Sequence, residues 1–463
     1  MRFGARSRRK PSGQLELALY GAQGSAGEPA SAPDGDESSA GTEHLMEEVA
    51  SRGNLVRALE RVVSNRGAAG VDGMTVKELR ASLIADVDQV SAQLLSGNYL
   101  PSPVRRVEIP KPSGGVRKLG IPTVWDRVVQ QAILQILQPR LDPTFSDQSY
   151  GFRPNRSAHD AVAQAQEFVR AGQAWVVDLD LEKFFDRVHH DRLMAALAKR
   201  IRDKRLLKLL RRFLTAGVLE DGLVSPTVEG TPQGGPLSPL LTNVVLDELD
   251  RELEARGHSF VRYADDVTIY VRSYAAASRV LETVSVFLEK RLRLRVNREK
   301  SAVGRPWERT LLGFTFSRGS GASPRVGPVP FARLKTRIRE LTQRSRGVSL
   351  QRVVDDLRRY LQGWFGYYGI GGWPLPGTPR SWRSFDQWVR RRIRSFRWGQ
   401  WKTRKARYLG LRERGVRRFD AACAAKCPKG PWHMSRTPAS NYAFQNAYLA
   451  ELGLPSLEAL SRA

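Results

Sequence analysis

The stretch that decides the fold is FVRYADDVTIYV, residues 260–271. Apolar side chains recur at every second position on both sides of a short break that contains Asp265 and Asp266, as in two half-buried strands joined by a tight turn. The stretch therefore predicts a β-hairpin with two adjacent carboxylates at its tip. Asp is common in solvated turns, so the pair alone does not indicate chemistry. A divalent cation would relieve the repulsion between the carboxylates, but that interpretation needs a third acidic group from elsewhere.

A candidate for the third group lies in AWVVDLDLEKFFDRV, residues 174–188. At the two-residue period of a strand, Asp178 and Asp180 share one face, and the apolar residues between them share the other. A buried strand seldom carries two carboxylates on one face unless a cation meets them. If this strand lies beside the hairpin, three carboxylates form a cage for two Mg²⁺ ions. Spacing alone leaves the choice between Asp178 and Asp180 open, and surface acids at a strand end are the structural alternative.

The charge balance points to an anionic partner. The 463 residues include 75 Lys and Arg against 47 Asp and Glu, a net charge of +28. Such a field favours nucleic acid, with an anionic membrane surface as the rival. No apolar run of transmembrane length is present, and no apolar segment follows the basic N-terminus as in a secretion signal. The two cysteines exclude a disulfide framework and fit a reducing cytosol.

The order of the expected elements favours an α+β fold over a doubly wound sheet. Residues 1–43 are rich in Gly, Ala, Ser and Pro, which predicts a disordered arm. The later pattern predicts a hairpin over 100–125, a helix over 126–140, a strand over 174–181, helical structure over 190–215, a loop over 230–239 followed by a helix to about 256, and basic helices from about 330.

Several segments together resemble one family. DLEKFFD, TPQGGPLSP, YADD, VNREKS and LLGFTF, in this order, are similar to the palm of the reverse transcriptases encoded by bacterial group II introns. RRVEIPKPSGGVRKLGIPTVWDRVVQQA and SYGFRPNRSAHDA resemble the fingers of that family, and RYLQGWFGYYG and FDQWVRRRIRSFRWGQWK resemble its thumb and maturase region. The resemblance covers about residues 44–458. It implies a right-hand polymerase with an N-terminal extension and fingers at 44–172, a palm at 173–325, an all-α thumb at 326–400 and a basic C-terminal RNA- or DNA-binding tail at 401–463.

The resemblance also implies a function. The expected activity is RNA-directed DNA polymerisation, with a maturase activity that supports intron splicing and retrohoming. The implied cofactors are two Mg²⁺ ions, with Mn²⁺ as a substitute. The implied partners are structured intron RNA, an RNA template with a DNA primer, dNTPs and target DNA, with no membrane, in the bacterial cytoplasm. The Cys- and His-rich endonuclease domain of some members has no counterpart before Ala463, so the type without it is expected.

Carried over residue by residue, the resemblance assigns Asp180, Asp265 and Asp266 as catalytic metal ligands, and this is what selects Asp180 over Asp178. It also assigns the main-chain carbonyl of Leu181 to a metal. Lys300, in VNREKS, is a candidate proton donor to the leaving pyrophosphate. Plain strand packing is the alternative for that segment.

Five further residues are assigned to the nucleotide. Lys111 and Arg117, on the expected hairpin, would hold the triphosphate, because Arg binds phosphate in a bidentate way and Lys acts as a point charge. Phe185 would act as a steric gate against the ribose 2′-hydroxyl. Gln233 and Gly234 would lie beside the incoming nucleotide and the template. A solvated basic hairpin and a core aromatic are the structural alternatives for the hairpin pair and for Phe185.

The C-terminal third is strongly basic. Between Arg380 and Asp420 there are fifteen Lys and Arg against three Asp and Glu, with tryptophans interleaved. A charge run alone is usually a solvated face, but Arg and Trp together suit a surface that follows phosphates and stacks bases, even though some of the tryptophans must be core. The nucleic-acid-binding residues expected here are Arg390, Arg391, Arg394, Arg397, Lys402, Arg404 and Lys405.

Two other functions stay open. One is a domesticated intron-like reverse transcriptase that works in DNA repair or phage defence, which a flanking ribozyme sequence would distinguish from an intron-borne enzyme. The other is an RNA-binding splicing cofactor with an inactive polymerase. The intact acidic residues, with Lys111, Arg117 and Phe185, argue against an inactive site.

Overall fold

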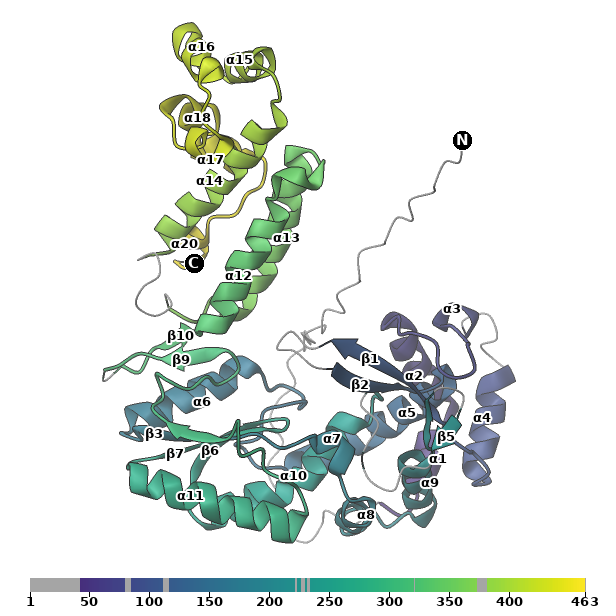
Figure 1. Ribbon diagram of the computed structural model, residues 1–463. Coiled ribbons are helices and arrows are strands. Elements are labelled where there is room, and N and C mark those ends of the chain that lie inside the picture. The colour runs from purple at the N-terminus through teal and green to yellow at the C-terminus, as the bar shows by residue number, and fades with distance from the viewer. Residues whose placement is uncertain are drawn as a thin grey trace, which may run out of the picture.

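The computed structural model describes residues 42–79, 85–110, 116–220, 223–225, 230, 234–319, 321–372 and 381–462. Most of the arm predicted for residues 1–43 lies outside this part of the chain. The described residues form two four-stranded sheets with helices packed around them, and a helical region that projects from the second sheet (Figure 1). This is the α+β arrangement that the sequence predicts.

The first sheet has the strand order β2-β1-β4-β5. The predicted hairpin is present as β1 (Val104–Pro110) and β2 (Val116–Ile121), which pair antiparallel. β4 (Val218–Glu220) lies parallel to β1, and β5 (Leu223–Ser225) pairs with β4. These two short strands fall inside the range predicted for the palm, yet they extend the fingers sheet. Strand pairing between β1 and β4 therefore joins residues from the two sides of the domain boundary predicted at residue 172.

Helices from both sides of that boundary surround the first sheet. They are α1 (Leu45–Ala50), α2 (Arg52–Ser64), α3 (Val76–Leu79), α4 (Ala85–Leu95), α5 (Val124–Leu141), η2 (Asp142–Thr144) and α9 (Lys204–Thr215). The hydroxyl of Thr123 accepts a hydrogen bond from the Asp126 amide, which fixes the start of α5. The apolar faces of these helices share one core with the palm, so fingers and palm are continuous.

The second sheet has the order β6-β7-β3-β8, with every pair antiparallel. Its strands are β3 (Trp175–Leu179), β6 (Ser259–Tyr263), β7 (Asp266–Val271) and β8 (Ala302–Gly304). α11 (Tyr274–Phe287) and α6 (Ala158–Arg170) lie on its two sides (Figure 1). The side chains alternate as predicted, because Val176 packs in the cluster with α6 while Val177 and Leu179 join the large core.

The remaining palm helices are α7 (Phe184–Arg187), α8 (His190–Ala198), α10 (Ser238–Ala255) and a single π-helical turn, η3 (Leu288–Leu292). The helical structure predicted over 190–215 is two helices rather than one. Asp203 separates them, because its carboxylate accepts hydrogen bonds from the amides of Arg205 and Leu206 and so begins a new helix.

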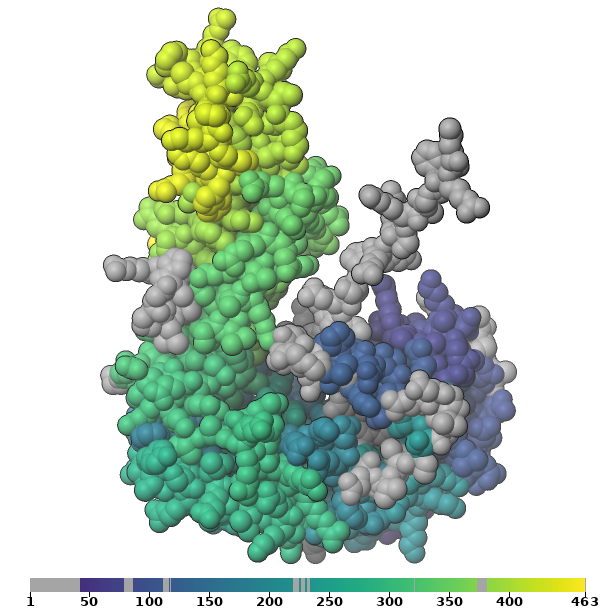
Figure 2. Space-filling view, in the orientation of Figure 1, coloured from purple at the N-terminus to yellow at the C-terminus, as the bar shows by residue number. Residues whose placement is uncertain are grey.

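The C-terminal region begins with a two-stranded sheet of β9 (Phe314–Phe316) and β10 (Pro324–Val326), and continues entirely in helices. These are α12 (Pro328–Leu341), η4 (Arg344–Arg346), α13 (Leu350–Tyr368), α14 (Trp382–Gln400), α15 (Arg404–Arg412), α16 (Arg418–Lys426), α17 (Pro431–Met434), α18 (Pro438–Ala443), α19 (Asn446–Glu451) and α20 (Leu457–Leu460). The region stands out from the palm as an arm (Figure 2).

One hydrophobic core runs through this arm, from Val326 to Leu457. α20 returns to the base of α14, where the buried Asp386 accepts hydrogen bonds from the Ser456 hydroxyl and the Leu457 amide. The thumb and tail predicted on either side of residue 400 thus share a core. In the described part of the chain, no helix combines the length and the apolar character needed to span a bilayer.

Candidate active site in the palm

The three predicted acids lie at one end of the palm sheet. In the β3–β7 ladder the last pair is Leu179 opposite Val267. Asp180 follows Leu179 and Asp266 precedes Val267, so both carboxylates leave the sheet at the same edge. Asp265 lies in the turn between β6 and β7, next to Ala264, whose φ of +58° gives the hairpin its tight reversal.

The carboxylates at this edge influence one another. Burial among neighbouring groups, and after it the charges of Asp265, Asp180 and Asp178, raise the pKa of Asp266 to about 6. Because the Asp266 residue is itself exposed to solvent, burial is incomplete there and the charges of the neighbouring acids matter as well. Acids that lie far apart in the sequence therefore share one electrostatic environment.

Asp178 and Asp180 differ in their partners. Arg309 Nε donates to Asp178 Oδ2 at 2.6 Å, and the Thr268 hydroxyl donates to Asp178 Oδ1 at 3.3 Å. Burial raises the pKa of Asp178, and the charge of Arg309 opposes that effect. The carboxylate of Asp180 instead has Lys300 Nζ at 3.6 Å. Asp178 thus forms a short ion pair that the sequence did not reveal, whereas Asp180 forms a longer ion pair with the exposed ammonium of Lys300.

The segment VNREKS holds the end of β3. The Asp180 amide donates to the Ser301 hydroxyl at 2.9 Å, and the Asn297 amide donates to the Asp180 carbonyl at 2.8 Å. Leu181 forms a single antiparallel bridge with Val296. Because successive carbonyls point to opposite sides of an extended strand, we expect the Leu181 carbonyl to be directed toward the side where β7 begins.

The donor chemistry of this edge suits a hard divalent cation, since Mg²⁺ prefers carboxylate, carbonyl and water oxygens. After burial, the charges of Asp265, Asp180 and Asp178 contribute to the raised pKa of Asp266, and a bound cation would offset those charges. Within the described residues, however, no three His, Cys, Asp or Glu side chains are arranged as a ready-made ion site. The acids lie within electrostatic reach of one another without forming a closed chelate.

A fully buried ion pair supports the hairpin tip. Arg262 donates from Nε and Nη2 to the Asp250 carboxylate at 2.7 and 2.6 Å, and neither side chain is exposed. Its Nη1 donates to Asn243 Oδ1 at 2.9 Å and to the Ala264 carbonyl at 3.0 Å. Sequence reasoning missed this support. The available signal was an arginine at the same strand period as the buried Phe260.

The loop SYGFRP also contacts the tip. The Tyr150 amide donates to the Arg262 carbonyl at 2.8 Å, and Asn243 Nδ2 donates to the Gly151 carbonyl at 3.0 Å. A Cβ on Gly151 would lie 2.2 Å from the Ala264 nitrogen, so only glycine permits this approach. A segment that resembles the fingers therefore packs directly against the turn that carries Asp265.

The structure describes only some of the residues that we expect to contact the nucleotide. Phe185 lies on α7, half-buried, with its ring edge-on to Phe184 at a centroid distance of 5.4 Å. Gly234 has a φ of +123°, and a Cβ there would lie 2.8 Å from the Gly120 carbonyl of β2, so the loop passes close to the fingers hairpin. Arg117 lies in β2 opposite Ile109.

Two of the predicted residues, Lys111 and Gln233, lie outside the described part of the chain, and so does the side chain of Arg117.

The basic residues of the arm lie in three different settings. Arg390, Arg391 and Arg394 line a hollow beside α14. Arg397 packs over the Trp401 ring at 5.4 Å, and burial lowers its pKa. The exposed residues between the end of α14 and the first turn of α15 are Lys402, Arg404 and Lys405. The tryptophans Trp382, Trp398 and Trp401 are core residues, as expected for some of them.

Two family models match the chain. Residues 109–316 match "Reverse transcriptase (RNA-dependent DNA polymerase)". Residues 331–415 match "Group II intron, maturase-specific domain". The first match contains the palm sheet with all three acids, and the second contains most of α12 and all of α13 to α15.

Among similar proteins, Protein YkfC of Escherichia coli K12 is 36% identical over 289 residues, which cover 54% of this chain and 76% of that one. The group II intron-encoded protein LtrA of Lactococcus lactis subsp. cremoris is 40% identical over 198 residues, 42% of this chain. The matched part spans about a third of LtrA, 32% of its length.

Among solved structures, a partial Cas6-RT-Cas1–Cas2 complex has a TM-score of 0.35 at 25% identity and covers 53% of this chain and 42% of its own. Telomerase from Candida albicans, with a fragment of telomeric RNA, has a TM-score of 0.40 at 14% identity, over 64% of this chain and 59% of its own. These superpositions are loose and add nothing to the assignment from sequence. The two family models and the identity to YkfC and LtrA place the chain in the reverse transcriptase family of RNA-directed DNA polymerases, in the group II intron type that carries a maturase-specific domain.

Proposed function

We propose that this chain copies RNA into DNA at the edge formed by Asp180, Asp265 and Asp266. In this reaction the primer 3′-hydroxyl oxygen attacks the α-phosphorus of a dNTP, the bond to the β-phosphate breaks, and pyrophosphate leaves. The observation that supports the proposal best is that Asp180 and the hairpin pair share one electrostatic environment. Mg²⁺ bound by these carboxylates and the Leu181 carbonyl, or Mn²⁺ in its place, supplies activation of the hydroxyl and neutralisation of the triphosphate.

The residues around the acids have roles in the same reaction. Lys300, 3.6 Å from Asp180, is placed to give a proton to the leaving pyrophosphate. Phe185 would exclude a ribose 2′-hydroxyl. The fingers hairpin would bring Lys111 and Arg117 to the triphosphate, where their charges offset its negative charge. Gln233 and Gly234 would lie along the nucleotide and the template.

We further propose that the helical arm binds the structured RNA of a group II intron and supports its splicing, and that the cDNA product serves retrohoming into target DNA. The match of residues 331–415 to the maturase-specific domain supports this role. The excess of cationic side chains on α14 and α15 supports it independently, because phosphate contacts dominate the affinity for RNA.

Primer extension on poly(rA)/oligo(dT), with and without Mg²⁺ or Mn²⁺, tests the polymerase directly. We expect extension only with a divalent cation, and we expect Asp265→Asn to abolish it while RNA binding persists. Asp420→Asn, an exposed acid of α16, removes the same charge away from the palm and serves as the matched control. Full extension by Asp265→Asn would refute the assignment. A wild-type chain that binds intron RNA but never extends a primer would favour the splicing cofactor.

A further inference from the structure

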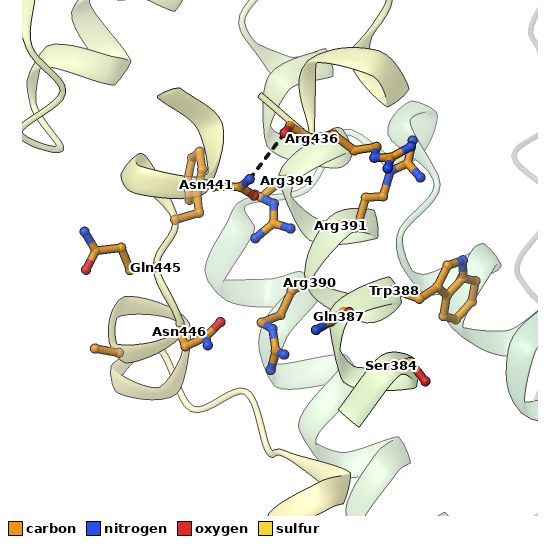
Figure 3. A pocket seen from close by; sticks show the side chains of 12 residues that line it. Ser384, Gln387, Trp388, Arg390, Arg391, Arg394, Arg436, Asn441, Gln445 and Asn446 are labelled. Atoms are coloured by element: carbon orange, nitrogen blue, oxygen red, sulfur yellow. Dashed lines mark hydrogen bonds between the residues drawn. The ribbon is translucent and has the colours of Figure 1, made fainter. Parts of the chain in front are cut away.

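A hollow of about 980 Å³ opens between α14 and the segment that contains α18 and α19 (Figure 3). Its volume lies at the upper end of the range for ligand sites, about 300–1,000 Å³. The groups that matter for recognition are four arginines and a set of side-chain amides. The arginines are Arg390, Arg391, Arg394 and Arg436, and the side-chain amides among the lining residues are Gln387, Asn441, Gln445 and Asn446.

The positive charge in this hollow is not compensated. No Asp or Glu lines it. The guanidinium groups of Arg390 and Arg436 make no hydrogen bond or ion pair with any residue that the structure describes. Arg394 Nε donates to the Ser435 carbonyl at 3.0 Å, and burial together with the charges of Arg390 and Arg391 lowers the pKa of Arg394 to about 10.

On the neighbouring helix α13, the charges of the arginines are compensated by acidic residues. On α13, Asp355 and Asp356 pair with arginines of the same helix and of η4. The single acid of α14, Asp386, is buried and holds the start of α20 instead. Like charges one turn apart on a helix destabilise it unless an opposite charge approaches. The arginines of α14 therefore present a site for an anion that comes from outside the chain.

The other groups at the hollow are suited to a nucleobase. Asn441 Nδ2 donates to the Arg436 carbonyl at 3.3 Å, which leaves its Oδ1 directed elsewhere. Asn446 begins α19 with an exposed side chain. Arg391 also lines the hollow, and its guanidinium lies over the Trp432 ring at 3.7 Å, so it is already partly engaged. Amides that both donate and accept hydrogen bonds match the edges of an unpaired base.

A continuous duplex does not fit these observations equally well. The bases of a duplex are stacked and turned inward, so a protein recognises mainly its backbone and shape. Arginines on a convex surface would suffice for such contacts. A concave site that combines cations with amides is suited to a phosphate together with the base attached to it.

We infer that the hollow between α14 and α18–α19 binds one unpaired nucleotide of RNA, with its phosphate on Arg390 and Arg394 and its base against Asn441 and Asn446. This inference rests on the proposed RNA-binding role of the arm and specifies what that surface recognises, namely a bulged or looped-out nucleotide within structured RNA.

The test uses the full chain and two RNA hairpins that differ by a single bulged nucleotide, with binding followed by fluorescence anisotropy. We expect tighter binding to the bulged hairpin. Asn446→Ala should weaken that complex about 3- to 10-fold, as for the loss of one or two hydrogen bonds, and leave binding to the paired hairpin unchanged. Arg390→Gln should weaken binding to both hairpins, and the bulged one more.

Arg418→Gln is the matched control, because it removes the same charge from an exposed position of α16 outside the hollow. It should reduce binding to both hairpins equally and slightly, if at all. The inference is overturned if Asn446→Ala affects the two RNAs alike or affects neither. Asn441→Ala, which removes the other amide placed against the base, provides a second variant should Asn446→Ala fail to fold. Extension of poly(rA)/oligo(dT) by the wild-type chain tests the polymerase separately, so either proposal can fail without the other.

Discussion

At the scale of single residues, the candidate site depends on which carboxylates already have a partner. Asp178 and Asp180 share a face of β3, and sequence periodicity alone cannot separate them. Their surroundings can, because an arginine occupies Asp178 at 2.6 Å while Asp180 is left to Lys300 at 3.6 Å. A carboxylate that is fully engaged by a guanidinium is a poor ligand for a cation, since the two positive charges compete for the same oxygens.

This contrast gives the first prediction. Asp180→Asn should abolish primer extension with little loss of stability, because its side chain is partly exposed and weakly paired. Asp178→Asn should keep measurable extension but lower the free energy of unfolding by about 1–3 kcal/mol, because Arg309 loses a charged partner. Extension rates and urea unfolding of the two variants check both effects. The assignment fails if Asp178→Asn is the inactive variant and Asp180→Asn extends normally.

Phe185 gives the second prediction. The ring is half-buried on a helix of only four residues and leans on Phe184, so truncation should alter the local surface without opening the core. Phe185→Ala should raise ribonucleotide incorporation relative to dNTP incorporation, because it removes the ring that we propose excludes the 2′-hydroxyl. Single-nucleotide insertion with dNTP and NTP pairs measures that ratio, with Phe184→Leu as the control for packing. Unchanged selectivity in Phe185→Ala would mean that the ring is only a packing residue.

At the scale of elements, the β6–β7 turn is held from two sides. The buried Arg262 donates a hydrogen bond to the Ala264 carbonyl from within the sheet, and the loop at Gly151 packs against the turn from the other side. The hairpin itself was predictable, because its period-2 pattern and its turn are local. The support was not, because Asp250, Asn243 and Gly151 come from α10 and a distant loop, and no local pattern encodes such contacts.

The buried pair gives the third prediction. Arg262→Met should lower the free energy of unfolding by about 3–5 kcal/mol, because it leaves Asp250 buried without a partner. The double variant Arg262→Met/Asp250→Leu should recover much of that loss, since no uncompensated charge remains. Primer extension should stay impaired in the double variant, because the Ala264 carbonyl has still lost its donor. Recovery of stability and of full activity together would show that Arg262 does not position the turn.

The fourth prediction concerns His190 at the start of α8. Its ring Nε2 donates to the Gly230 carbonyl at 2.7 Å. Burial lowers the pKa of His190, helped by Arg211 and His189, and outweighs the opposing effects of the Gly230 hydrogen bond and Asp191. A lowered pKa means that the unfolded chain binds the proton first. The stabilisation is therefore complete above the unfolded value of about 6.5 and is lost as the pH falls below it.

Urea unfolding at about pH 5 and about pH 8 measures this effect across the range in which histidine titrates. His190→Gln keeps a donor for Gly230 and should reduce the difference in stability between the two pH values. His433→Gln, at an exposed position, should leave the difference as it is in the wild type. An equal pH dependence in the wild type and in His190→Gln would contradict the prediction.

At the scale of the whole molecule, the chain order and the spatial order diverge at two places. β4 and β5 leave the palm range to extend the fingers sheet, and α20 returns to the base of α14. Composition and periodicity could predict the strands, the helices and the basic character of the arm, because these are properties of short segments. They could not predict the two returns, because pairing between distant segments is decided by the complete fold.

The distribution of charge gives the last prediction. The chain carries a net charge of +28, and Lys402, Arg404 and Lys405 are exposed at one bend of the arm. Binding to structured RNA should weaken steeply with salt, because each phosphate that a cation neutralises releases a counterion. Replacing all three residues by Gln should lower the slope of log K against log salt by about 2 to 3, close to one per lost contact. A titration of wild-type and triple-variant chains between low and physiological salt measures both slopes.

Asp420→Asn, which removes a nearby negative charge, should leave the slope unchanged or steepen it. A flat wild-type titration would show that the arm does not bind RNA through its phosphates, and an unchanged slope in the triple variant would place the phosphate contacts elsewhere on the arm.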